Sequence, residues 1–272
     1  MGWQLYETFT DFKHHTIMFS AFSWKDRLRA SGIHLGISLC LAGLAALLVF
    51  AVWYPYPYRE ISGGRALFSL VVTVDVILGP LITLTVFNRA KPRAELRRDL
   101  ALVGLIQLAA LGYGLWSVAV ARPVHLVFEY DRFRVVHAVD VPPELLSRVP
   151  PDVEALPWHG PTLLALRPFR DSNEQAQATL AALDGLPLSA RPDLWQSYPL
   201  ARQQVLAAAR PVTQLQQRFA ARAAEIDAVL ARSGRVPAQA VYLPMVGRQS
   251  FWTVFLDPVT AHVLAFMPLD SF

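Results

Sequence analysis

Three long apolar segments lie between Gly32 and Ala121, and they constrain the fold more than any other feature of this sequence. They cover residues 32–53, 66–87 and 100–121. About 20 apolar residues are needed to cross the roughly 30 Å hydrocarbon layer of a membrane as a helix, and each segment is long enough. A buried helical hairpin of a water-soluble protein would need shorter segments that are apolar on one side only. The sequence therefore predicts three transmembrane helices.

The composition of the whole chain agrees with this prediction. Of its 272 residues, 54% are hydrophobic, and the mean hydropathy is +0.33. Soluble domains usually contain about 45–50% apolar residues. Because the excess is concentrated in the three segments, it indicates membrane helices and not an unusually large soluble core. The single cysteine, Cys40, lies in the first segment, which excludes a disulfide bond within the chain.

Basic residues flank the three segments unevenly. The two groups on one side are Lys13, Lys25, Arg27, Arg29 before the first segment, and Arg89, Lys91, Arg93, Arg97, Arg98 between the second and third. The loop between the first two segments has only Arg59 and Arg65. Short loops rich in Lys and Arg stay in the cytoplasm. We therefore expect a multi-pass protein of a bacterial inner membrane, with a cytoplasmic N-terminus and a periplasmic C-terminal half.

The net charge of +4 does not indicate a nucleic-acid-binding protein. Residues 1–122 hold 12 Lys and Arg against 7 Asp and Glu, whereas residues 123–272 hold 13 against 14. The basic excess thus belongs to the membrane half, where the orientation explains it. In the C-terminal half the arginines are balanced by acids, so no basic surface for nucleic acid is expected.

We predict three regions along the chain. Residues 1–31 form a cytoplasmic N-terminal tail, residues 32–121 form the three-helix transmembrane region, and residues 122–272 form a periplasmic α+β domain. The tail has two interpretations: either Met18 is the true start of the protein, or the first 22 residues are an ordinary cytoplasmic extension.

The C-terminal half has the patterns of a small sheet covered by helices. Alternation over 124–130 predicts a strand that returns over 134–139 across the turn 131–133. Further strands are expected at 240–243, 251–256 and 262–267, and helices at 173–183, 199–209 and 212–230, the last closed by Gly234. The prolines between residues 142 and 161 indicate an irregular connection. The predicted fold class is therefore a membrane α-helical protein with a C-terminal α+β domain.

Asp75 is the most informative single residue, because it is the only acid in the three segments. A carboxylate near the middle of a transmembrane helix costs about 2.5–3.5 kcal/mol. Pairing with Gln107, a hydroxyl or the backbone inside the bundle would offset this cost, and so would a cation from a partner helix. Gly79 and Pro80 follow one turn later, and the missing Pro80 amide hydrogen predicts a kink that lets another helix approach. Asp75, Gly79 and Pro80 are thus our candidates for contact with a partner helix or for structuring the bundle.

No pattern of catalytic, cofactor-binding or metal-ligating residues is present. The sequence has no nucleophile elbow, no zinc-protease helix and no glycine-rich phosphate loop. His14-His15 is a poor metal site without further ligands, and His34 is interpreted as a packing or interfacial residue. In the C-terminal half, Trp158, Arg132 and Arg248 are candidate contact residues, although burial is the favoured interpretation of Trp158. We therefore do not expect an enzyme, a cofactor or a bound metal.

Several motifs together resemble the type IV pilin accessory proteins of the TfpX/TfpZ family. The resemblance extends from Trp24 to the C-terminus. The matching motifs are GIHL at 32–35, WYP at 53–55, VDVILGPL at 74–81, ARPV at 121–124, VFEYDRF at 127–133, LPW at 156–158, LPMVGR at 243–248 and PLDSF at 268–272. The most specific of these are the aspartate–glycine–proline motif and the motif at 127–133.

This resemblance implies an inner-membrane accessory protein or chaperone that binds and stabilises a type IV pilin and assists pilus assembly. The implied partners are the lipid bilayer and a pilin, through its transmembrane helix and its globular head, together with a second copy of the chain or other assembly components. One alternative is a membrane-anchored sensor whose outer domain binds a ligand. A second alternative is a subunit of an intramembrane enzyme or transporter, for which a single acid in the membrane is weak support.

Overall fold

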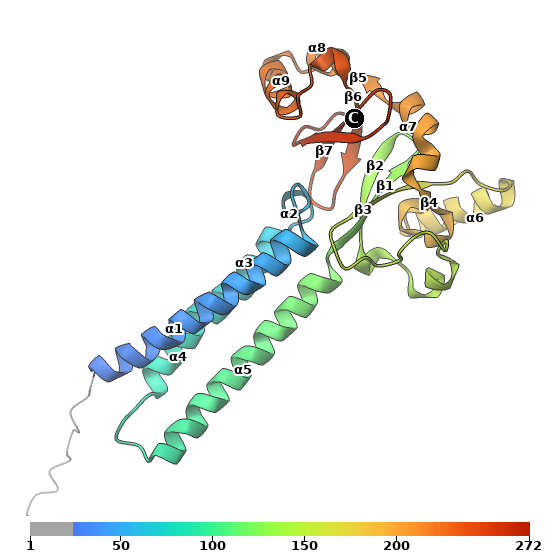
Figure 1. Ribbon diagram of the computed structural model, residues 1–272. Helices are drawn as coiled ribbons and strands as arrows, with labels where there is room; N and C mark the ends of the chain where they lie inside the picture. The colour runs from blue at the N-terminus through green and yellow to red at the C-terminus, as the bar shows by residue number, and fades with distance from the viewer. Residues whose placement is uncertain (1–23) are drawn as a thin grey trace, which may run out of the picture.

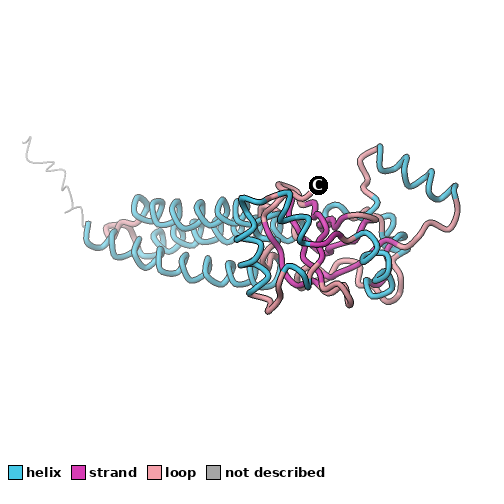
Figure 2. Tube along the Cα trace, turned by 90° about the horizontal axis from the view of Figure 1, so that it is seen from above, coloured by secondary structure: helices cyan, strands magenta, loops and turns pink. Residues whose placement is uncertain are grey.

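The computed structural model describes residues 24–272 and consists of a helical bundle followed by a sheet domain (Figure 1). Figure 2 shows the bundle at one end of an elongated molecule and the strands at the other. Most of the predicted tail at 1–31, including His14, His15 and the alternative start at Met18, lies outside the described residues.

Three helical stretches form the bundle, and each is long and apolar enough to cross a membrane. The first consists of α1 (Trp24–Leu47) and η1 (Leu48–Trp53), the second of α3 (Gly64–Thr73), η2 (Val74–Leu78) and α4 (Gly79–Val86), and the third of α5 (Arg93–Val120). The first and third therefore begin seven or eight residues before the predicted apolar segments, because charged residues continue the same helices toward the loops. The short helix α2 (Tyr58–Ile61) connects the first stretch to the second.

Two turns of the bundle are π-helical and not α-helical. They are η1, at the end of the first stretch, and η2, which contains Asp75 and precedes Pro80 in the second stretch. Pro80 lies in the first turn of α4, where a missing amide hydrogen is tolerated. The disturbance that we predicted at Pro80 thus takes the form of a wider helical turn immediately before it, which single π-helical turns commonly provide.

The C-terminal domain is built on a mixed sheet, which has eight strands within the described residues. Its order is β4-β3-β1-β2-β6-β7-β8, and β5 pairs with β6. The strands are β1 (Pro123–Glu129), β2 (Arg132–His137), β3 (Thr162–Leu166), β4 (Trp195–Ser197), β5 (Arg210–Pro211), β6 (Val241–Val246), β7 (Phe251–Leu256) and β8 (Val263–Met267). The pairs β1–β3 and β2–β6 are parallel, and the other pairs are antiparallel.

Helices and short 3₁₀ turns connect the strands. The α-helices are α6 (Ser172–Leu183), α7 (Arg202–Ala208), α8 (Val212–Arg218) and α9 (Ala223–Ala231). The 3₁₀ turns are η3 (Ala138–Asp140), η4 (Pro143–Arg148), η5 (Leu188–Ala190), η6 (Pro192–Leu194), η7 (Tyr198–Ala201), η8 (Ala220–Arg222) and η9 (Pro237–Gln239). In Figure 1, α8 and α9 lie near β5 and β6, and α6 lies at the β4 end of the sheet.

The predicted α+β class is confirmed, with corrections to individual elements. The strands β4 and β5 were not predicted because they are very short, and β3 was not predicted because it lacks a clear alternation. The helix predicted at 212–230 is two helices, since the backbone leaves the helical conformation at Phe219. The first hairpin turns at two residues, Tyr130 and Asp131, and not at three. Gly234 has a positive φ of 67° after α9, as expected for a residue that ends a helix.

The short helix α2 joins the bundle to the sheet domain. Its residues Tyr58 and Ile61 are buried in the same hydrophobic cluster as residues of β1, β2, β6 and β7. The amide of Gln249 in the β6–β7 loop donates to the carbonyl oxygen of Ile61 at 3.2 Å. Tyr54 is also fully buried, and its hydroxyl donates to the carbonyl oxygen of Val118 in α5. The aromatic segment after the first helix therefore belongs largely to the protein core and not to an interfacial belt in contact with lipid.

Candidate functional site

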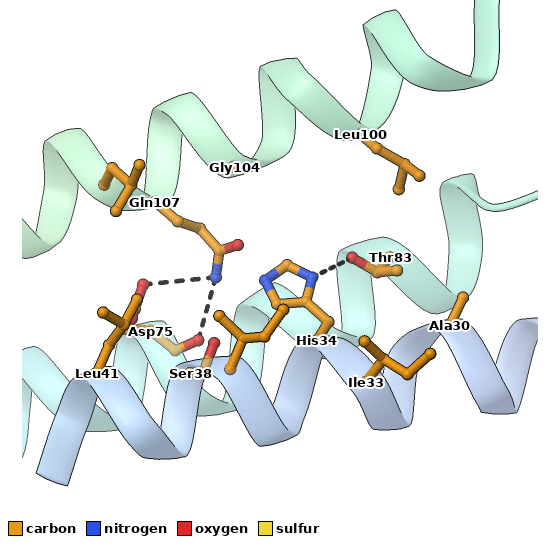
Figure 3. A pocket seen from close by; sticks show the side chains of 12 residues that line it. Ala30, Ile33, His34, Ser38, Leu41, Asp75, Thr83, Leu100, Gly104 and Gln107 are labelled. Carbon is orange, nitrogen blue, oxygen red and sulfur yellow. Dashed lines mark hydrogen bonds between the residues drawn. The ribbon is translucent and has the colours of Figure 1, made fainter.

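A pocket of about 530 Å³ lies within the bundle, between α1 on one side and α5 on the other (Figure 3). Most of its wall is apolar, with contributions from Ile33, Ile37 and Leu41 of α1 and from Leu100 and Leu108 of α5. The polar lining residues are His34, Ser38, Asp75, Thr83 and Gln107. The pocket thus combines the apolar wall that a membrane-embedded segment needs with a few polar groups in defined positions.

Asp75 lies at this pocket and is paired with Gln107. The Nε2 atom of Gln107 donates to the Asp75 carbonyl oxygen at 3.2 Å and to its Oδ1 atom at 3.4 Å. The Asp75 side chain is directed into the bundle, and the residue is only 7% exposed. The expected pairing of Asp75 inside the bundle is therefore present. However, the Oε1 atom of Gln107 is buried and has no hydrogen-bond partner in the described part of the chain.

Gly79 provides the space in which the Gln107 side chain reaches Asp75. A Cβ atom at Gly79 would collide with Nε2 of Gln107, so only glycine fits while Gln107 holds this position. We had expected the glycine to permit a close approach by another helix, and the approaching group is this side chain of α5. Pro80 is buried beside it, and its carbonyl oxygen accepts a hydrogen bond from the Ser31 hydroxyl of α1 at 2.9 Å.

His34 joins α1 to α4 on the same side of the pocket. Its Nδ1 atom is hydrogen-bonded to the hydroxyl of Thr83, and Figure 3 shows its ring between Thr83 and the Gln107 side chain. His34 thus packs between two helices, which is one of the two roles expected for it, and it also lines the pocket. The sequence alone does not indicate that His34 and Ser38 belong to the site, because both lie on α1, far along the chain from Asp75.

The arrangement can accept hydrogen-bond donors or a positive charge from a segment that enters between α1 and α5. The Asp75 carboxylate and the Gln107 Oε1 atom are both acceptors. Neither needs a metal to fulfil this role, and residues 24–272 contain no group of three or more His, Cys, Asp or Glu that could hold a metal ion. The site therefore has the chemistry of a binding site for a polar or cationic part of an apolar segment.

The three candidate contact residues of the outer domain lie in different surroundings. Trp158 is 52% exposed, so its expected burial is wrong. Its ring packs edge-on against Trp53 at 5.3 Å between centroids, and the Arg122 guanidinium lies 5.6 Å from the ring centroid. Trp158 is half exposed because it covers the junction where the helices meet the domain, at its surface.

Arg132 and Arg248 are held by contacts within the domain. Arg132 forms an ion pair with Asp131 and lies over the ring of Phe272, 5.1 Å from its centroid. Arg248 forms an ion pair with Asp140, with 2.7 Å between Nη2 and Oδ1. Arg132 thus lies at the hairpin turn, whereas Arg248 lies in the loop that contacts α2. The structure does not bring the three residues into one site.

Comparison with known proteins gives a consistent result. The model of the family described as fimbrial assembly protein FimB matches residues 22–63. The fimbrial assembly protein of serogroup I from Dichelobacter nodosus is 34% identical over 246 residues, which cover 90% of this chain and 95% of that protein. This chain belongs to the fimbrial assembly protein family.

Other members of this family support the assignment. The serogroup E1 protein of Dichelobacter nodosus is 32% identical over the same share of both chains. The protein of serogroups C1 and C2 is 43% identical over 122 residues, which cover 45% of this chain and 91% of that protein. No solved structure matches the chain significantly.

Proposed function

We propose that this protein is an inner-membrane accessory factor of fimbrial assembly that binds a type IV pilin before its incorporation into a pilus. In this proposal the apolar helix of the pilin enters the pocket between α1 and α5, and the outer domain faces the globular head. The finer resemblance to the TfpX/TfpZ accessory proteins supports the same role. The protein acts by holding its partner, without catalysis.

The observation that carries this proposal is the pocket at Asp75 in a bundle of three membrane-length helices. A pilin that awaits assembly has a membrane helix, and the pocket offers such a helix an apolar wall with acceptors at one position. The names of the relatives support the process, since each is a fimbrial assembly protein. The proposed orientation has a cytoplasmic N-terminus and a periplasmic domain after Arg122, which would place the domain on the side of the pilin head.

Site-specific photo-crosslinking in native membranes tests the proposed binding site. A photoreactive residue at Ile37 or Leu108, both in the pocket wall, is expected to crosslink to the pilin. The matched control is Leu47, which is exposed on α1 and does not line the pocket. Crosslinks from Leu47 alone would contradict binding in the pocket, and absence of pilin from all positions, including Trp158 of the outer domain, would contradict pilin binding itself.

Substitution of Asp75 tests the polar part of the site. Asp75→Asn keeps the shape of the side chain and removes its charge, so we expect about tenfold less pilin to be crosslinked from Leu108, the effect of losing one charge-assisted hydrogen bond. The matched control is Ser117→Ala, because the Ser117 hydroxyl donates only to the Tyr113 carbonyl of its own helix. Unchanged crosslinking in Asp75→Asn would exclude Asp75 from pilin binding.

A further inference from the structure

The outer domain contains a second pocket, which we call the arginine pocket and define by Arg134, His137, Asp140 and Arg248. Its volume is about 410 Å³. Strand β2, the turn η3, the loop after α6 and the β6–β7 loop contribute to its wall. Segments that are far apart in the sequence therefore bring two guanidinium groups, a histidine and the Asp140 carboxylate to one cavity.

The two arginines keep hydrogen-bond donors beyond those used in their ion pairs. Nε of Arg134 donates to Oε2 of Glu129 at 2.9 Å, and Nη2 of Arg248 donates to Oδ1 of Asp140 at 2.7 Å. Each of these pairs occupies one nitrogen of a guanidinium that carries five N–H groups. The remaining N–H groups form the planar fork that suits phosphate or carboxylate oxygens.

His137 positions the Asp140 carboxylate in the wall of the same pocket. The residue is 2% exposed, and its Nδ1 atom lies 3.0 Å from Oδ2 of Asp140. Its Nε2 atom is buried and has no hydrogen-bond partner among residues 24–272. Because the Asp140 carboxylate can only accept, Nδ1 carries the hydrogen of its bond to Oδ2, and His137 holds Asp140 in the position where it pairs with Arg248.

The arginine pocket lies at the level where the membrane helices end. The apolar part of α5 ends at Val120, and the carbonyl oxygen of Arg122 accepts a hydrogen bond of 2.9 Å from the amide of Ala138 in η3. On the other side of the pocket, the β6–β7 loop is bonded to Ile61 of α2. The headgroup layer of a bilayer extends roughly 5–8 Å beyond the hydrocarbon on each side, so residues directly after α5 lie within it.

We propose that the arginine pocket binds the phosphate of an anionic phospholipid headgroup from the leaflet that faces the outer domain. Arg134 and Arg248 donate to the phosphate oxygens, and His137 lies beside them. The position at the headgroup layer favours a lipid over a phosphate compound in solution, which would present the same chemistry. This site would fix the outer domain on the membrane surface, and it does not depend on whether the bundle binds a pilin.

Native mass spectrometry of the full chain released from detergent micelles tests this proposal, with phosphatidylglycerol, phosphatidylcholine and inorganic phosphate as probes. We expect one phosphatidylglycerol to be retained, with about tenfold weaker binding in Arg248→Gln and in Arg134→Gln. Arg248→Lys keeps the positive charge but lacks the planar fork of N–H groups. Its binding of phosphatidylglycerol should therefore be intermediate between that of the native protein and that of Arg248→Gln. The matched control is Arg222→Gln, since Arg222 is paired with Glu225 on the exposed surface of α9 and η8.

Several results would overturn the proposal. If both Arg248→Gln and Arg134→Gln retain phosphatidylglycerol as well as the native protein does, the arginine pocket is not the lipid-binding site. Equal retention of phosphatidylcholine would show that an anionic headgroup is not selected. Displacement of the lipid by millimolar inorganic phosphate, with the same variants affected, would assign the pocket to a soluble anion instead. Circular dichroism of each variant shows whether a loss of binding is accompanied by loss of the fold.

Discussion

Individual residues of the bundle show how a membrane protein can contain a carboxyl group. Asp75 faces the interior of the bundle and receives the Gln107 amide, so the cost of its burial is met by a neighbouring helix and not by lipid. The pairing depends on a residue without a side chain, Gly79, that leaves room for Gln107. The energetic requirement of one residue is thus satisfied by two others on different helices.

Replacement of Gly79 tests this dependence. Gly79→Ala is expected to displace the flexible end of Gln107 from Asp75 and to lower the free energy of unfolding by about 1–3 kcal/mol, because the buried Asp75 loses its hydrogen-bond donor. The matched control is Gly112→Ala in α5, where an added Cβ atom meets nothing within 4 Å. Thermal unfolding of the purified proteins in detergent measures the stability of both variants. Equal stability of the two variants would show that the close approach at Gly79 is not important.

His125 makes the stability of the outer domain depend on pH. It is fully buried, and its ring nitrogens are hydrogen-bonded to the Thr162 hydroxyl and the Ala155 carbonyl oxygen. Burial lowers the pKa of His125 to about 4, although the bond to Ala155 opposes this shift. Between pH 6.5 and 4 the unfolded chain therefore binds a proton that the folded chain does not.

We expect the free energy of unfolding to decrease by up to roughly 3 kcal/mol as the pH falls from 6.5 to 4. His125→Gln removes the titrating group and should show a smaller decrease, even if it is less stable at pH 7. His262→Gln replaces an exposed histidine and should behave like the native protein. Chemical unfolding at several pH values measures these slopes. If the free energy of unfolding of His125→Gln depends on pH as strongly as that of the native protein, His125 is not the group responsible.

At the scale of elements, the short helix α2 connects the packing of the bundle with that of the sheet domain, although it has only four residues. It lies between two membrane helices, yet Ile61 is fully buried in the core of the outer domain. Gly247 permits this contact, because a Cβ atom there would collide with Ile61. The bundle and the sheet domain are therefore packed together through α2 in addition to the direct connection after α5.

Ile61→Ala tests the coupling through α2. Removal of a fully buried isoleucine is expected to lower the free energy of unfolding by about 2–5 kcal/mol and to increase hydrogen exchange in β6 and β7. Ile33→Ala is the matched control, because Ile33 is largely exposed on α1. Hydrogen exchange measured by mass spectrometry reports the exchange in β6 and β7 separately from that in the rest of the protein. Unchanged exchange in β6 and β7 would mean that α2 and the domain are independent.

At the scale of the whole molecule, the unequal charge of the loops predicts one orientation in the membrane. Alkaline phosphatase, which is active only in the periplasm, is expected to be active when fused after Phe272 and inactive when fused after Arg93, in the first turn of α5. A cytosolic reporter at the same positions should give the opposite pattern. Phosphatase activity only in the fusion after Arg93 would show that the protein has the opposite orientation. It would exclude an encounter between the outer domain and a pilin head.

The membrane helices and the α+β class could be predicted from the sequence, because the length of apolar segments and the periodicity of apolar residues are local properties. The same holds for Asp75, whose energetic cost in a membrane does not depend on the fold. Other features depended on tertiary contacts. The strands β4 and β5 are too short to have a pattern of their own, and β3 lacks a clear alternation; all three form where neighbouring strands satisfy their hydrogen bonds.

The pocket and the role of α2 were decided by the tertiary structure alone. No local pattern indicates that His34, Asp75 and Gln107 line one cavity, or that Ile61 enters the core of a domain that begins some 60 residues later. The physical reason is that hydrophobicity determines which segments leave water, whereas their neighbours are selected by shape, as at Gly79 and Gly247.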